Sequence, residues 1–185
     1  MKRGAYAPLL FGVRIATPMM DRIRSAFTRE NLTLTFLLLL YSVFLGALDL
    51  ITKAWAYSSL QLHTPLRVIG DVVRFTLVVN YNTAFGLSFG KDFPYALMAS
   101  VLAIFLFFVM LWERRKVYKF LYATILGGAI GNIVDRVMRG GVVDFVDVGV
   151  GNFRWYTFNL ADVWVTLGLA GLVLLFLVGE RESQS

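Results

Sequence analysis

Residues 93–112, FPYALMASVLAIFLFFVMLW, carry no charged side chain. A helix rises about 1.5 Å per residue, so about 20 residues cross the hydrocarbon core of a bilayer. This run therefore predicts a membrane-spanning helix. Three more uncharged runs lie around it, at 31–48, 120–134 and 163–179. The first and last reach spanning length once their flanks are counted, and the run at 120–134 does so if Lys119 or Asp135 lies near an interface.

The composition agrees with a membrane protein. The 185 residues are 58% hydrophobic and 16% charged, whereas an average soluble domain is roughly 25% charged. The length is enough for one domain. The chain has no cysteine, which excludes a thiol nucleophile, a disulfide framework and a cysteine-based metal site. Its only histidine is His63, which argues against a zinc site with paired histidines, and we expect no metal and no cofactor.

The basic residues predict how the chain is oriented. They gather in the arm before residue 30 and in the link 114–119, and such clusters mark the cytoplasmic side. Both termini are then cytoplasmic, and the stretches 49–92 and 135–162 face outward. The net charge of +6 is mostly this topology signal, together with attraction to anionic lipid, so we expect no nucleic acid partner.

These observations define the expected organisation. The fold class is mostly α-helical and integral to the membrane, with four transmembrane helices, a small β-rich extracytoplasmic subdomain and cytoplasmic termini. A basic arm, disordered or loosely bound to the membrane surface, precedes a four-helix domain and a short tail. The outer loop between the first two helices is rich in valine, phenylalanine and threonine, a composition typical of short strands. The predicted bounds are 1–30 for the arm, 31–180 for the domain, 57–92 for the β-rich outer loop, 138–158 for a second outer loop, and 181–185 for the tail.

Several polar residues near the predicted helix ends have a simple local interpretation. Asp49 and Lys53 lie four residues apart, which suggests an ion pair at the outer interface. Asn159 precedes Asp162 by three residues, a spacing typical of a helix N-cap. Three glycines, at 127, 128 and 131, would permit close helix packing.

The acids on the predicted outer side are the best candidates for chemistry. They are all aspartates, namely Asp49, Asp71, Asp92, Asp135, Asp144, Asp147 and Asp162. Two carboxyls held close together cannot both ionise cheaply, so one keeps a proton and the other stays charged. Such a pair can activate water and protonate a leaving amine, which is peptide hydrolysis without a metal. Asp162 is one candidate, and spacing alone does not choose its partner among Asp135, Asp144 and Asp147.

Two other functions fit parts of the sequence. Residues 86–90, GLSFG, match the G-x-S-x-G pattern of serine hydrolases, with Ser88 as nucleophile and His63 as the available base. A small proton- or ion-coupled transporter could use Asp49, Asp135 and Asp162 as a relay. Against the transporter, no acid lies in the middle of any predicted span, where a relay needs one.

The order of five short motifs resembles that of the lipoprotein signal peptidases, the aspartic membrane proteases of bacteria. The motifs are DLITKAW (49–55), NYNTAFG (80–86), GNIVDR (131–136), GVVDF (141–145) and FNLAD (158–162). Each is weak alone, but all five occur in order over four spans. One departs from the family pattern: the second usually reads Asn-x-Gly, and its third position here is Asn82, a residue that tolerates a left-handed backbone.

The resemblance implies specific roles. Asp144 and Asp162 would be the catalytic pair, and Asp147 a bystander. The residues implied to bind substrate or support the pair are Asp49, Lys53, Asn80, Asn132, Asp135, Arg136, Asn159 and Ala161. The implied substrate is a prolipoprotein whose lipobox cysteine carries diacylglycerol, cut just before that cysteine. The implied location is the bacterial cytoplasmic (inner) membrane, in contact with lipid, with the site at the outer, periplasmic face. We expect a monomer.

Overall fold

The computed structural model describes residues 26–81, 90 and 93–184. The elements in chain order are α2 Arg29–Ser59, β1 Leu66–Ile69, β2 Val73–Asn80, α3 Tyr95–Trp112, α4 Lys116–Arg139, β3 Val142–Val150, β4 Phe153–Arg154 and α5 Leu160–Gln184. Most of the basic arm, Asn82, Ser88 and Asp92 lie outside the described residues, so the expectations placed on them stay predictions.

Four helices are long and apolar enough to cross a membrane, as the uncharged runs predicted. They are α2, α3, α4 and the part of α5 from Leu160 to Gly179. The helix α4 reaches spanning length by including Lys119 and Asp135, which flank its uncharged run. Both of these side chains are fully buried inside the protein, so α4 carries them without presenting a charge to lipid.

The helix α4 is central and packs against α2, α3 and α5. Its glycines allow this, as predicted: a Cβ at Gly127 would lie 2.8 Å from the Cβ of Leu45 on α2, and one at Gly128 would meet the Ala161 carbonyl of α5. The faces turned away from these contacts expose large apolar side chains such as Phe36, at 60%, and Phe105, at 67%. An apolar surface of this kind suits lipid.

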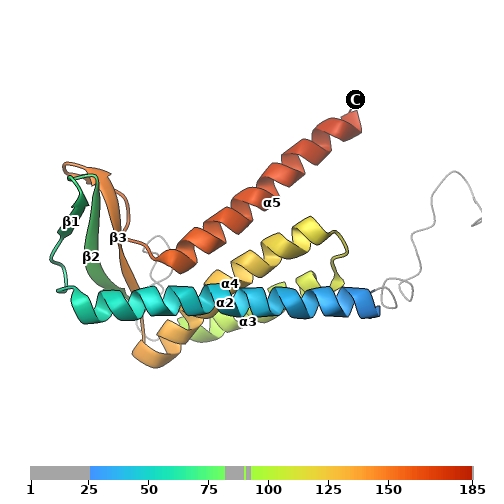
Figure 1. Ribbon diagram of the computed structural model, residues 1–185, viewed down its shortest axis with the longest axis horizontal. Helices are drawn as coiled ribbons and strands as arrows, with labels where there is room; N and C mark the ends of the chain where they lie inside the picture. Colours follow the sequence, from blue (N-terminus) through green and yellow to red (C-terminus); the bar gives the residue numbers. More distant parts are fainter. Residues whose placement is uncertain (1–25, 82–89, 91–92, 185) are drawn as a thin grey trace, which may run out of the picture.

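A four-stranded antiparallel sheet, in the order β1-β2-β3-β4, lies at one end of the helices (Figure 1). The start of α2, the link from α3 to α4 and the C-terminal end of α5 lie at the other end. The helices therefore alternate in direction, as four consecutive spans require. Which side of the membrane each end faces stays a prediction.

The structure shows the secondary structure of both predicted outer segments. Residues 57–59 of the first belong to α2, and its two strands follow as expected at 66–69 and 73–80. The second, at 138–158, is not simply a loop, because 142–150 form β3, which pairs with β2 through Val78 opposite Asp144 and Asn80 opposite Val142. A short apolar run bounded by glycines fits a buried strand. Here these residues form a strand because they pair with β2, which is distant in the sequence.

Candidate active site

Asp144 projects from β3 and is buried, with 4% of its surface exposed. Its two carboxylate oxygens accept hydrogen bonds from the amides of Asn159, at 2.6 Å, and Asn80, at 3.2 Å. Asp147 lies three positions along the same strand. Because successive side chains of a strand point to opposite faces, Asp144 and Asp147 cannot face the same site.

Asp162 lies in the first turn of α5, where a reciprocal cap holds it. The Asp162 amide N–H donates to Asn159 Oδ1 at 3.0 Å, and the Asn159 amide N–H donates to Asp162 Oδ2 at 3.2 Å. This is the capping-box arrangement, and it confirms the N-cap predicted from the spacing of the two residues. The cap fixes the position of the carboxylate relative to the helix.

Two asparagines connect the acids. The Asn159 side-chain amide donates to Asp144 Oδ1 and, at 3.2 Å, to Asn132 Oδ1. The Asn132 side-chain amide in turn donates to Asp162 Oδ1 at 3.0 Å. Asp144 and Asp162 are thus bridged by a short chain of amides, although they come from a strand and a helix.

A buried ionic cluster supports this chain from α2. Lys53 Nζ donates to Asn132 Oδ1 at 2.7 Å and lies 2.7 Å from Asp49 Oδ2 and 3.6 Å from Asp135 Oδ2. Asp49 also accepts the Ala161 amide N–H at 2.8 Å. The predicted Asp49–Lys53 pair is therefore present, but it is fully buried between helices rather than placed at an interface.

Asp135 holds β3 in position rather than joining the pair. One of its oxygens accepts the Val143 amide N–H at 2.8 Å, and the other is bonded by Arg139. Val143 immediately precedes Asp144 in the chain. The Asp135 carboxylate thereby anchors the backbone of the strand next to the residue that faces the site.

The surroundings of Asp144 change its acidity. Burial, reinforced by the negative charge of Asp162, raises the pKa of Asp144 to about 7. Two amide hydrogen bonds, from Asn159 and Asn80, oppose this rise. Asp144 can therefore carry a proton near neutral pH, which is the property needed of a general acid.

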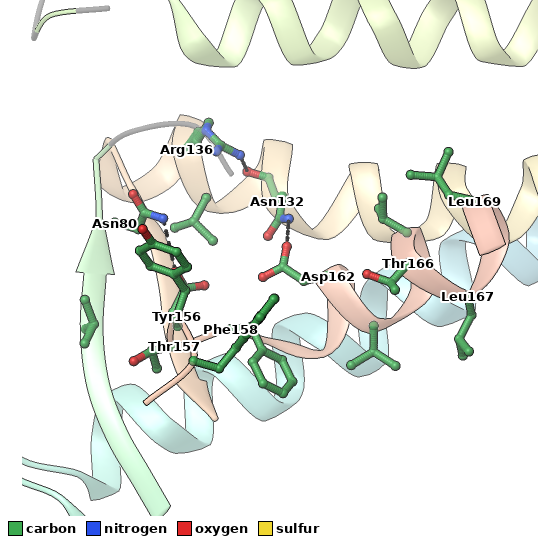
Figure 2. A pocket seen from close by; sticks show the side chains of 16 residues that line it. Asn80, Asn132, Arg136, Tyr156, Thr157, Phe158, Asp162, Thr166, Leu167 and Leu169 are labelled. Carbon is green, nitrogen blue, oxygen red and sulfur yellow. Dashed lines mark hydrogen bonds between the residues drawn. The ribbon is translucent and has the colours of Figure 1, made fainter. Parts of the chain in front are cut away.

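A cavity of about 730 Å³ opens beside the two acids (Figure 2). Its polar part contains Asn80, Asn132, Arg136, Asp144 and Asp162. Arg136 donates from Nη1 to the Asn132 carbonyl at 3.2 Å and interacts electrostatically with both acids. The rest of the lining is mainly apolar and comes from β2, β3, the segment 155–158 and the first turns of α5.

Some lining residues were missed by sequence reasoning. They are Trp155, Tyr156, Thr157 and Phe158, which directly precede Asn159. Their position in the sequence could have indicated this role. Residues that lead directly into the cap of α5 must lie close to Asp162, which the cap positions.

Other acids of the outer segments are used elsewhere. Asp147 is buried and accepts hydrogen bonds from Arg154 Nε at 2.8 Å and from the Thr76 hydroxyl at 3.1 Å. Asp71 pairs with Arg74, which lowers the pKa of this exposed carboxyl. Among the residues that the structure describes, no cluster of three or more histidines, cysteines, aspartates or glutamates could hold a metal ion.

The chain is similar to known proteins in sequence and in fold. A family model described as signal peptidase (SPase) II matches residues 41–178. The chain is 37% identical over 153 residues to the lipoprotein signal peptidase of Xylella fastidiosa strain M12, covering 78% of this chain and 90% of that protein. It is also 37% identical to the lipoprotein signal peptidase of Caldicellulosiruptor bescii, covering 71% and 83%.

The fold matches as well. A bacterial membrane enzyme solved in meso at 2.3 Å resolution superposes with a TM-score of 0.70 at 24% identity, covering 80% of this chain and 90% of that chain.

Proposed function

The chain belongs to the signal peptidase II family, and from this we propose that it is an aspartic endopeptidase that cuts diacylglyceryl-modified prolipoproteins just before the lipidated cysteine. The observation that carries the proposal is the bridged pair of Asp144 and Asp162 at the polar end of a largely apolar cavity.

The two acids support complementary roles. Asp162 as the carboxylate takes a proton from a water molecule, whose oxygen attacks the scissile carbonyl carbon. Asp144 gives its proton to the leaving nitrogen as the peptide bond breaks. The raised pKa of Asp144 favours this assignment, and the positive charge of Arg136, which lines the same cavity, would stabilise the negative charge of the intermediate. The remaining polar residues hold the pair in place.

The shape of the cavity suits a lipid-bearing peptide. Beyond Asp162 its lining continues along α5 with Val163, Val165, Leu167 and Leu169. Acyl chains would lie along this apolar side, and the peptide would pass the polar end next to the sheet. This arrangement keeps the lipid in the bilayer while the scissile bond reaches the acids.

The location and assembly follow the same proposal. The chain is a multi-pass membrane protein, which we place in the bacterial cytoplasmic membrane with both termini inside and the site at the outer face. It would act as a monomer in contact with lipid, without cofactor or metal.

The alternatives have less support. A relay would need acids distributed across the membrane, whereas Asp49, Asp135 and Asp162 gather at the sheet end of the helices. Ser88 lies outside the described residues, and the proposal predicts that Ser88→Ala leaves the chemistry nearly unchanged.

The decisive experiment uses the purified protein with a diacylated lipobox peptide. The wild type should cleave the peptide before the cysteine, and Asp144→Asn should be inactive while still folded in membrane. Full activity of Asp144→Asn would refute the aspartate mechanism.

A further inference from the structure

Thr166 is one of the polar side chains that line the cavity and have no part in the network described above. Thr166 lies on α5 four residues after Asp162, about 6 Å further along the helix axis and on the same face. It lines the cavity, and Figure 2 places its hydroxyl oxygen on the side of Asp162. Its neighbours in that part of the lining, Val163, Val165, Leu167 and Leu169, are all apolar.

The hydroxyl of Thr166 is also available for a hydrogen bond. Serine and threonine side chains in helices commonly bond the carbonyl one turn earlier, as Thr35, Ser42, Ser100 and Thr124 do here. Within the described residues the Thr166 hydroxyl makes no hydrogen bond. The Thr166 side chain is exposed, so its hydroxyl is accessible to a bound molecule, and in an apolar membrane environment a polar group of that molecule would be a favourable partner.

We propose that Thr166 forms a subsite that donates a hydrogen bond to an ester carbonyl of the substrate's diacylglyceryl group. The inference rests on the proposed function. The glyceryl esters are attached a few bonds from the cysteine sulfur, so they lie slightly deeper than the scissile peptide bond. Their carbonyl oxygens accept hydrogen bonds and donate none. A hydroxyl one turn below the acid that activates water matches them in depth and in chemistry.

The contribution expected of this subsite is modest and specific. A hydrogen bond between polar groups in a membrane protein typically stabilises by about 0.6–1.7 kcal/mol, which corresponds to about three- to eighteenfold in binding. The ester does not react, so the effect should appear mainly in KM, with kcat nearly unchanged.

The test compares two lipobox peptides that differ only in the lipid linkage. One carries an ester-linked diacylglyceryl group, and the other carries an ether-linked dialkylglyceryl group that lacks the carbonyls. The wild type should cleave both, with a KM about three- to eighteenfold lower for the ester. Thr166→Val, which keeps the shape and removes the hydroxyl, should raise the ester KM to the ether value and leave the ether KM unchanged.

Two further variants separate a subsite from a structural effect. Thr166→Ser keeps the hydroxyl and should retain the preference for the ester. Thr33→Val removes an exposed threonine near the start of α2 and should alter neither KM. An equal change for both peptides in Thr166→Val, or no change for either, would overturn the subsite. A wild type that cleaves neither peptide would overturn the proposed function itself.

Discussion

Two clusters of buried polar side chains lie at opposite ends of the helices, and each contains a fully buried lysine. At the end away from the sheet, Lys119 donates to Asn31 Oδ1 at 2.7 Å and to the Thr35 hydroxyl at 2.6 Å. Asn31 also donates to the Leu111 carbonyl at 3.0 Å. These neutral contacts join the start of α4 to α2 and the end of α3.

At the sheet end, Lys53 lies between the carboxylates of Asp49 and Asp135. It donates a hydrogen bond to Asn132 Oδ1, and the Asn132 side-chain amide donates to Asp162. A cavity adjoins this second cluster. Burial of a charge between membrane helices therefore does not identify a functional site. The second cluster differs because its hydrogen bonds lead to acids that line a cavity.

The largest effect is expected when one acid of the pair is replaced. Asp162→Asn should lower the cleavage rate by about 10³-fold or more, because the amide cannot take a proton from water. Asp147→Asn should keep most of the activity, since Asp147 bonds Arg154 and Thr76 on the other face of the sheet region. Cleavage of the diacylated peptide by both variants measures this difference, and equal losses would show that Asp147 belongs to the site.

The next largest effect is expected from replacing the two buried lysines, Lys53 and Lys119, one at a time. Lys53→Met leaves two buried carboxylates without their cation, which should cost about 3–5 kcal/mol of unfolding free energy and at least about tenfold in activity, because Asn132 loses a partner. Lys119→Met removes bonds to neutral oxygens only and should cost about 1–3 kcal/mol with unchanged activity. Unfolding in detergent and the cleavage assay measure both quantities. A comparable loss of activity in Lys119→Met would contradict the distinction between the clusters.

A smaller, graded effect should come from pH. If Asp144 provides the proton, activity should fall as the pH rises through about 7, by up to about tenfold per unit.

Stability should follow the same group. Folding raises the pKa of Asp144 from 3.8 to about 7. The contribution of this group to stability is therefore fully present below about pH 4 and is lost as the pH rises to about 7. Unfolding measured at pH 5 and pH 8 checks this. The part of the pH dependence of stability that is due to Asp144 should be absent in Asp144→Asn. If that variant shows the same pH dependence, another group is responsible for it.

The smallest effect concerns packing at the sheet end. A Cβ at Gly131 would meet the carboxylate of Asp49, whereas a Cβ at Gly179 meets nothing within 4 Å. Gly131→Ala should therefore destabilise by about 1–3 kcal/mol, and Gly179→Ala should stabilise slightly through helix propensity. Thermal unfolding of the two variants tests the contrast. A harmless Gly131→Ala would mean that Asp49 is free to move.

Much of this architecture was predictable from the sequence, because it depends on local patterns. Uncharged runs located the four spans, and the three-residue spacing of Asn159 and Asp162 located the start of α5. The four-residue spacing of Asp49 and Lys53 predicted their pairing. It did not predict their burial, which depends on where α4 packs.

The choice between Asp144 and Asp147 also needed long-range information. Residues 142–150 form a strand because they pair with β2, and the pairing partner lies more than 60 residues earlier in the chain. Once the strand is known, its two-residue period puts the two acids on opposite faces. Before that, the motif resemblance alone favoured Asp144.

The origin of the two acids has a consequence for biosynthesis. Asp144 belongs to β3, and Asp162 belongs to α5, the last described element of the chain. Their bridge also runs through Asn132 from α4, which accepts a hydrogen bond from Lys53 of α2. A ribosome-bound chain that has inserted only its first three spans lacks both Asp162 and its cap. If the pair acts as proposed, the protein gains activity only when the final helix has docked.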